Sequence, residues 1–219
     1  MAQDNLRRDT YHHGDLANAL TVAATDLARQ GGPEAVVLRE AARQVGVSAT
    51  AAYRHFAGHG DLIHEVKERC QAALAEHMRA EVDAVPPVAD PRQEAVRRLR
   101  ALGRGYIRFA LAEPGLFRTA FCRAESPREK TLDMMTAPAF TMLAEVLDEL
   151  TELGLIDPAR RPYAETVAWG NAHGIAALLV DGPLNGLPDE YRDATVERTI
   201  DATVAGLCTG ARAEDLAVA

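Results

Sequence analysis

The chain has 219 residues, 47% of them hydrophobic and 26% charged, which is enough apolar material for the cores of a small domain and a larger one. No apolar run reaches the roughly 18 residues that span a bilayer, and the polar start does not have the pattern of a secretion signal. We therefore expect a cytoplasmic protein that does not contact a membrane. The three cysteines are widely spaced, which argues against disulfides and zinc sites and indicates small buried or half-buried residues.

Charge is divided unevenly along the chain. The formal net charge is −8, yet residues 1–60 contain as many arginines as acids, so the entire deficit lies downstream. Nucleic-acid binding depends on cations placed against phosphates, which a strongly acidic protein supplies poorly. Because the excess of acids lies in the later part of the chain, the first 60 residues could still form a local basic surface for DNA.

The spacing of apolar residues predicts an all-α fold. These residues recur every three or four positions, and no stretch alternates in the manner of a strand. The first helix is expected to end at Gly31-Gly32-Pro33 and to bury one face, formed by Leu16, Leu20, Ala23, Ala24 and Leu27. The expected helices span residues 15–29, 38–45, 49–55, 61–84, 91–112, 126–153, 159–180 and 189–207, with a turn at 116–122. Pro138 is a candidate for a disturbance within the helix 126–153. The tail after Gly210 is expected to fray.

The segment 38–48 has the pattern of a helix-turn-helix. Small residues line the inner side of its first helix, Gly46 supplies a tight turn, and Ser48 is suited to cap the helix that follows. Such a turn frees the second helix to enter the major groove of DNA. Many ordinary helical hairpins also contain a glycine turn, so the pattern alone leaves both interpretations open.

Longer stretches resemble the TetR family of repressors. The resemblance covers residues 10–66 and includes Tyr53-Arg54-His55-Phe56 followed by Ala57-Gly58-His59-Gly60-Asp61-Leu62, which is similar to the end of the recognition helix and the start of the linker helix. Tyr11-His12-His13-Gly14-Asp15-Leu16, the segment 106–118 and Trp169-Gly170-Asn171-Ala172-His173-Gly174 resemble the branch with a Trp…His-Gly signature in its regulatory domain. This chain has Thr50 and His59 where the family usually has Gly and Lys.

The resemblance implies that residues 1–60 form a DNA-binding domain. It assigns phosphate contacts to Tyr53 and His55, while Arg54 is a long cation suited to a guanine or a phosphate. Arg7 and Arg8 are candidates for an arm that touches the DNA backbone or minor groove. Each assignment has a structural alternative: a tyrosine packed on the core, a serine that only caps, or solvated arginines. The candidate DNA contacts are Arg39, Arg43, Ser48, Thr50, Tyr53, Arg54, His55 and His59.

The resemblance assigns residues 61–219 to ligand binding and dimerisation. Trp169 and His173 are four residues apart and share a helix face, which suits the wall of a pocket for a mostly apolar effector. The alternative is that these residues and their aromatic neighbours are ordinary core. The small residues of 170–177 let this helix approach another closely, and with the last helix they suit a dimeric four-helix interface. The candidate ligand contacts are Tyr106, Phe109, Phe117, Met135, Trp169 and His173.

Two other functional classes fit the sequence less well. An enzyme needs a nucleophile, a phosphate loop or a metal cluster, and only Asp61-Leu62-Ile63-His64 approaches a carboxylate–histidine metal motif. A helical adaptor without DNA binding has no need for the cations of 53–55. We therefore expect a homodimeric, ligand-responsive regulator, a repressor rather than an activator, that binds double-stranded operator DNA and a small-molecule effector. No cofactor, metal or catalytic site is expected, and the sequence names neither the operator nor the effector.

Overall fold

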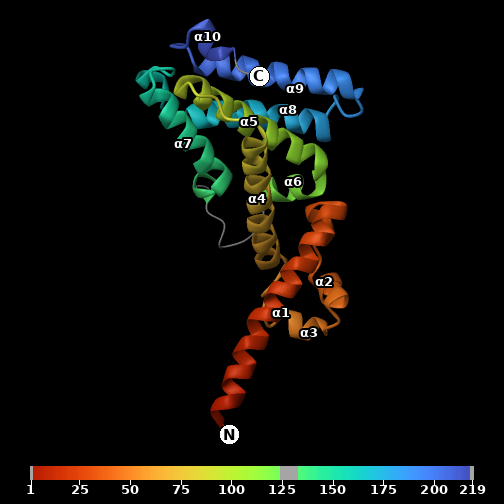
Figure 1. The fold of residues 1–219 in the computed structure, drawn as a ribbon. Helices are drawn as coiled ribbons and strands as arrows, with labels where there is room; N and C mark the ends of the chain where they lie inside the picture. Colours follow the sequence, from red (N-terminus) through yellow and green to blue (C-terminus); the bar gives the residue numbers. More distant parts are fainter. Residues whose placement is uncertain (1, 124–132, 218–219) are drawn as a thin grey trace. The chain divides into compact units, whose positions relative to one another are not determined.

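The described part of the chain is entirely helical, as predicted. The computed structural model describes residues 2–123 and 133–217, with side chains from residue 16 and, after the gap, from residue 135. None of the described helices combines the length and the apolarity needed to cross a bilayer. The helices are α1 (Ala2–Gly31), α2 (Leu38–Val45), α3 (Ala49–Ala52), α4 (His59–Ala84), α5 (Pro91–Ala112), α6 (Pro114–Phe121), α7 (Pro138–Glu152), α8 (Ala164–Val180), α9 (Asp189–Leu207) and α10 (Ala213–Leu216), with 3-10 turns at Pro33–Ala35, Asp133–Thr136 and Pro158–Arg160 (Figure 1).

The chain forms two compact units, and neither is a continuous stretch of sequence. The first unit comprises Met1–Gln71 and Glu113–Asp133, and the second comprises Ala72–Ala112 and Met134–Ala219. Helix α4 begins in the first unit and ends in the second. The expected boundary after residue 60 falls near the start of α4, whereas the two units divide within this helix, after Gln71.

In the first unit, α1 packs against α2, α3 and α6. Its predicted inner face is confirmed, because Leu20, Ala23, Ala24 and Leu27 are buried and Leu16 is half-buried. The helix begins at Ala2 rather than near residue 15, since the polar residues before Leu16 give no amphipathic signal that would mark a helix. The side chains of residues 1–15, which include Arg7, Arg8, His12 and His13, lie outside the described part of the structure.

Helix α6 belongs to the first unit although it follows α5 in sequence. The sequence predicts only a turn here, but Pro114 starts a helix, because a missing N–H costs nothing in the first turn. Gly115 lies directly on α1: a Cβ added at this position would come within 2.3 Å of the Ala28 carbonyl oxygen. At the other end, the ammonium of Lys67 donates to the Cys122 carbonyl at 2.7 Å. Both ends of α6 are therefore fixed within the first unit.

In the second unit, α5 is the central helix and packs against α7, α8, α9 and α10. It carries six arginines along its 22 residues. Two of them reach α9, where Arg100 pairs with Asp201 at 2.9 Å and Arg104 pairs with Glu197 at 2.7 Å. Buried charges are tolerated only when they are paired and hydrogen-bonded. The acids of α9 therefore allow α5 to be buried.

Two helices of the second unit begin later than the apolar pattern indicates. A helix over 126–153 with a disturbance at Pro138 is expected, and α7 begins at this proline, since proline is accepted in the first turn and not in a helix interior. Residues 124–132 lie outside the described part. Helix α8 begins at Ala164 rather than near residue 159, because Tyr163 adopts a left-handed conformation (φ 67°) that interrupts the helix.

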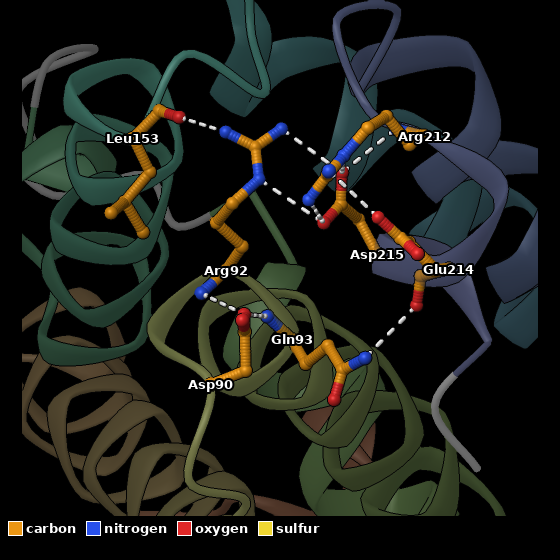
Figure 2. Close-up of polar contacts among 7 residues, drawn as sticks. All are labelled: Asp90, Arg92, Gln93, Leu153, Arg212, Glu214 and Asp215. Atoms are coloured by element: carbon orange, nitrogen blue, oxygen red, sulfur yellow. Dashed lines mark hydrogen bonds and ion pairs between the residues drawn. The ribbon is translucent and has the colours of Figure 1, made fainter.

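Helix α10 packs against α5, so the prediction that the tail after Gly210 frays is wrong for its described residues, which end at 217. Figure 2 shows that the Asp215 carboxylate accepts hydrogen bonds from Nε and Nη2 of Arg92, at 3.1 and 3.0 Å, and from the backbone N–H of Arg212 at 2.8 Å. The same Arg92 donates to the Leu153 carbonyl at the end of α7. The Arg92 guanidinium holds the pKa of Asp215 well below its usual range. Arg92 and Asp215 are 123 positions apart, so apolar periodicity gives no sign of this contact.

Replacing Asp215 with Asn should destabilise the second unit, because a neutral amide cannot hold two guanidinium groups. The depressed pKa means that this stability is present above about pH 4 and is lost as pH falls, when the unfolded carboxyl takes up a proton. Thermal unfolding followed by circular dichroism should show a lower midpoint for Asp215→Asn at pH 7 and a smaller difference from the wild type near pH 3.

Glu214→Gln is the matched control, because the neighbouring Glu214 pairs with Arg212 at the surface, where both side chains are exposed. It should unfold close to the wild-type midpoint. Equal midpoints for the two variants at pH 7 would contradict the role assigned to Asp215.

Candidate functional site

The turn between α2 and α3 has the geometry predicted for a helix-turn-helix. Gly46 ends α2 in the left-handed region (φ 81°), which favours glycine. Ser48 then caps α3, as predicted, because its hydroxyl accepts a hydrogen bond from the Ala51 N–H at 3.2 Å. Regular α-helix covers Ala49–Ala52, and hydrogen-bonded turns continue the coil to Phe56.

The helix-turn-helix has an apolar base and a polar outer surface. Ala41, Ala42, Ala52 and Phe56 are buried in the base. Tyr53 is 46% exposed, so it lies at the surface rather than in the core. The predicted DNA contacts that are exposed are Arg39, Arg43, Ser48, Thr50, Tyr53, Arg54 and His59, and His55 is half-buried.

The cations of this surface differ in their partners. Arg39 and Arg54 have no acidic partner among the described side chains, whereas Arg43 pairs with Glu40 at 2.5 Å. The Arg43 guanidinium lowers the pKa of the Glu40 carboxyl, so the pair is fully ionised at neutral pH. Glu40 is absent from the residues predicted for this surface, although its spacing of three from Arg43 on a helix is a recognisable signal.

Helix α4 begins at His59, two residues before the predicted start at Asp61. The Asp61 carboxylate accepts a hydrogen bond from the Ala57 N–H at 3.1 Å, which fixes the turn that leads into the helix. His59 is therefore held, exposed, at the position where α4 leaves the helix-turn-helix.

Three of the predicted ligand contacts meet in the second unit, between α5 and α8. The Trp169 Nε1–H donates to the Tyr106 hydroxyl at 3.1 Å, and this hydroxyl lies 2.8 Å from Nδ1 of His173. The His173 ring also lies near both aromatic rings, with centroids 6.3 Å from Tyr106 and 5.7 Å from Trp169. Tyr106 is buried, and the other two residues are half-buried. We call these residues the polar trio.

Burial determines the protonation of the polar trio. It raises the pKa of Tyr106 far above the usual phenol range and lowers the pKa of His173, so both groups are neutral at pH 7. A neutral imidazole with its proton on Nε2 leaves Nδ1 to accept from the Tyr106 hydroxyl, which in turn accepts from Trp169. The Tyr106 hydroxyl thus joins Trp169 to His173 through two hydrogen bonds between neutral groups, which suits contact with an uncharged molecule.

The other three predicted ligand contacts lie elsewhere. Phe109 is buried on α5 and meets the edge of His77, with ring centroids 5.9 Å apart. Met135 is 57% exposed in the turn Asp133–Thr136. Phe117 belongs to the first unit, where it packs against Phe121 at 5.3 Å. The structure therefore brings together Tyr106, Trp169 and His173 and places Phe117 in a different unit.

The described residues offer no metal cluster and no activated thiol. No group of three or more His, Cys, Asp or Glu residues among them is arranged to hold a metal ion. Cys70 and Cys208 are buried and Cys122 is half-buried, as predicted. Burial raises the pKa of Cys70 to about 12 and that of Cys208 to about 11, so both stay protonated thiols at neutral pH.

A helix-turn-helix with an exposed polar surface, joined through α4 to a second helical unit, defines a transcriptional regulator that binds DNA through its N-terminal part. Residues 20–66 match the family model described as bacterial regulatory proteins, tetR family, and residues 99–203 match the model described as tetracyclin repressor-like, C-terminal domain. The chain therefore belongs to the TetR family of transcriptional regulators, which are not enzymes. This confirms, at the level of the family, the resemblance found in the sequence.

Solved structures share the whole fold. A protein of unknown function from Rhodococcus sp. RHA1 is 27% identical, with 90% of this chain and 98% of that chain covered and a TM-score of 0.70. A TetR family transcription regulator from Marinobacter aquaeolei VT8 is 15% identical over 87% and 96% of the two chains, with a TM-score of 0.64. The TetR family regulator PfmR from Thermus thermophilus is 17% identical over 84% and 96%, with a TM-score of 0.52. None of the curated proteins matches the chain.

Replacing Tyr106 with Phe should destabilise the second unit, because the lost hydroxyl joins Trp169 to His173. Two hydrogen bonds worth about 0.5–1.5 kcal/mol each predict a decrease of about 1–3 kcal/mol in the free energy of unfolding. Denaturation in urea at pH 7.5 measures this decrease. Tyr191→Phe removes the hydroxyl of an exposed tyrosine on α9 and should change stability by less than about 0.5 kcal/mol. Equal stability of the two variants would show that the trio contributes nothing to the fold.

Proposed function

We propose that this TetR family regulator is a repressor that binds a quasi-palindromic operator as a homodimer and is released by a small, mostly apolar effector. The observation that carries the proposal is the outer surface of α2 and α3. Ala41, Ala42, Ala52 and Phe56 face inward, while the hydroxyls, Tyr53 and the arginines face outward. A helix pair with this division can dock on DNA without disturbing the apolar base beneath it.

In the proposed complex, α3 lies in the major groove and α2 crosses the phosphate backbone. Arg54 is long and exposed at the end of α3, and it has no acidic partner among the described side chains, so it can reach a guanine edge. Thr50 presents a hydroxyl near the start of the same helix, which suits a phosphate or a base edge. The other proposed contacts to phosphate are those of Arg39, Arg43, Tyr53, His55 and His59. Ser48 contributes through its cap.

We propose α8 and α9 as the surface that joins two copies. Outward-facing residues recur on α8 at helical spacing, with Val167 (51% exposed) and Leu178 (41% exposed) on either side of Gly170 and Gly174. A Cβ added at either glycine would meet nothing within 4 Å, so a second helix can approach closely there. Two copies paired through these helices form a four-helix interface. The dimer would then present its two α3 helices to major grooves about 34 Å apart on one face of the DNA.

We propose that the effector binds beside the polar trio. Trp169 and His173 come from the Trp…His-Gly segment, and their contact with Tyr106 supports placing the chain in the branch of the family with that signature. Helix α4 contributes residues to both units, so it can transmit a change in the second unit to the first. The effector shifts the equilibrium only by its differential affinity for the two arrangements. Trp169 is the only tryptophan of the chain, so its fluorescence reports binding at this place.

Arg54→Ala should abolish specific operator binding and leave the protein folded, because it removes a cation from the exposed end of α3. The loss of one good base contact is worth about 1–3 kcal/mol of discrimination. The measurement is fluorescence anisotropy with an operator selected in vitro from random duplexes. Arg79→Ala, which removes an exposed arginine outside the helix-turn-helix, should bind like the wild type. Wild-type affinity of Arg54→Ala for this operator would remove Arg54 from the interface.

Leu178→Glu should convert the dimer to a monomer, because it places a charge in the apolar surface proposed as the interface. Sedimentation velocity measures the change, and operator affinity should fall with it. Val22→Glu is the control, since Val22 is exposed to a similar extent (43%) on α1. A dimeric Leu178→Glu protein would locate the interface elsewhere.

A further inference from the structure

Arg43, in the last turn of α2, forms a bidentate ion pair with the Glu40 carboxylate. Nε of Arg43 donates to Oε2 of Glu40 at 2.9 Å, and Nη2 donates to Oε1 at 2.5 Å. Both carboxylate oxygens and two nitrogens of one edge of the guanidinium are engaged. Planar, bidentate pairing of this kind is also the way in which arginine binds phosphate. Glu40 therefore occupies one of the two edges through which Arg43 could hold a DNA phosphate in this way.

The Glu40–Arg43 pair lies where the carboxylate and a DNA phosphate could compete for the same arginine. Arg43 lies one helical turn after Arg39 and three residues before the turn at Gly46, and its side chain is 74% exposed. The Glu40 side chain is less exposed, at 36%. In a helix-turn-helix, the first helix crosses the DNA backbone, so α2 presents these side chains to phosphates.

We propose that Glu40 limits the DNA affinity of this regulator by pairing with Arg43, so that the guanidinium meets a phosphate with one edge occupied and its charge offset until the carboxylate is displaced. This inference rests on the proposed role of α2 and α3 as the DNA interface. The carboxylate is ionised at neutral pH in the free protein, because Arg43 lowers its pKa. The pair thus brings a negative charge to the DNA together with the positive one. The two unpaired cations of the surface, Arg39 and Arg54, bear no such restraint.

Removing the carboxylate charge should release one phosphate contact per subunit. Each phosphate neutralised by a cation makes the plot of log K against log salt steeper by about 0.9. If the extra contact contributes nothing at about 1 M salt, this slope gives roughly a five-fold gain in affinity at about 0.15 M salt. The gain is independent of sequence, because phosphate contacts carry no base information. Glu40 therefore restrains binding to all DNA and leaves base recognition to α3.

The test compares Glu40→Gln and Glu40→Ala with the wild type, using a 30-base-pair duplex of random sequence and anisotropy at several salt concentrations. Both variants should bind more tightly, by roughly five-fold per subunit engaged, with a salt slope steeper by about 0.9 for each contact. The gain should vanish when Arg43 is also changed to Gln. Thermal unfolding verifies that each variant is folded.

Asp26→Asn is the matched control. Asp26 forms the same kind of exposed pair, three residues before Arg29 on α1, at 2.7 Å. Arg29 also pairs with Glu113 at 3.1 Å, so this change removes a negative charge from the same unit without releasing an arginine. It should leave both affinity and salt slope near the wild-type values.

Three results would overturn the inference: an unchanged salt slope in the Glu40 variants, an equal gain in Asp26→Asn, or a gain that persists in the Arg43→Gln background. The last would mean that Glu40 acts by simple repulsion. Failure of the proposed DNA interface gives a different result, because then Arg54→Ala also binds the duplex and the operator like the wild type.

Discussion

Helix α5 can lie at the centre of the second unit only because its arginines meet acceptors from the surrounding helices. Arg97 is nearly fully buried, and it donates to Glu94 and to the carbonyls of Val82 and Val85 at the end of α4. Other arginines of α5 reach acids on α7, α9 and α10. Charge-assisted hydrogen bonds are directional, so these contacts fix the position of each neighbour along α5, while apolar burial supplies most of the stability.

Apolar spacing predicted the bounds of some helices closely. It failed for α6 and α7, which begin at prolines, and where polar contacts decide. The bounds of α2 and α5 agree with the sequence, since Gly46 and the prolines around α5 interrupt the pattern. Helix α10 was missed because a four-residue helix has too few apolar positions to be detected, and its docking depends on a contact between its Asp215 and Arg92, 123 positions earlier in the chain. No local pattern predicts a contact of that separation.

The candidate sites were predictable to the extent that they are local. Ser48 and the exposed residues of α3 follow from a helix-turn-helix pattern, and Trp169 and His173 meet because they are one helical turn apart. The assignment of Phe117 to the same group followed from chemistry alone, whereas packing places α6 in the first unit. Charge summation over residues 1–60 also hid which cations are restrained, because pairing between Glu40 and Arg43 depends on side-chain geometry.

The contact of Gly115 with α1 has a consequence for exchanging recognition modules among relatives. The piece of protein that surrounds the helix-turn-helix is discontinuous in sequence, since α6 contributes to it from beyond α5. A chimera made by a single cut in α4 would set a foreign α1 backbone against this glycine, where less than the width of a methyl group is left free. A graft that transfers α6 together with α1 preserves the close contact between Gly115 and the α1 backbone.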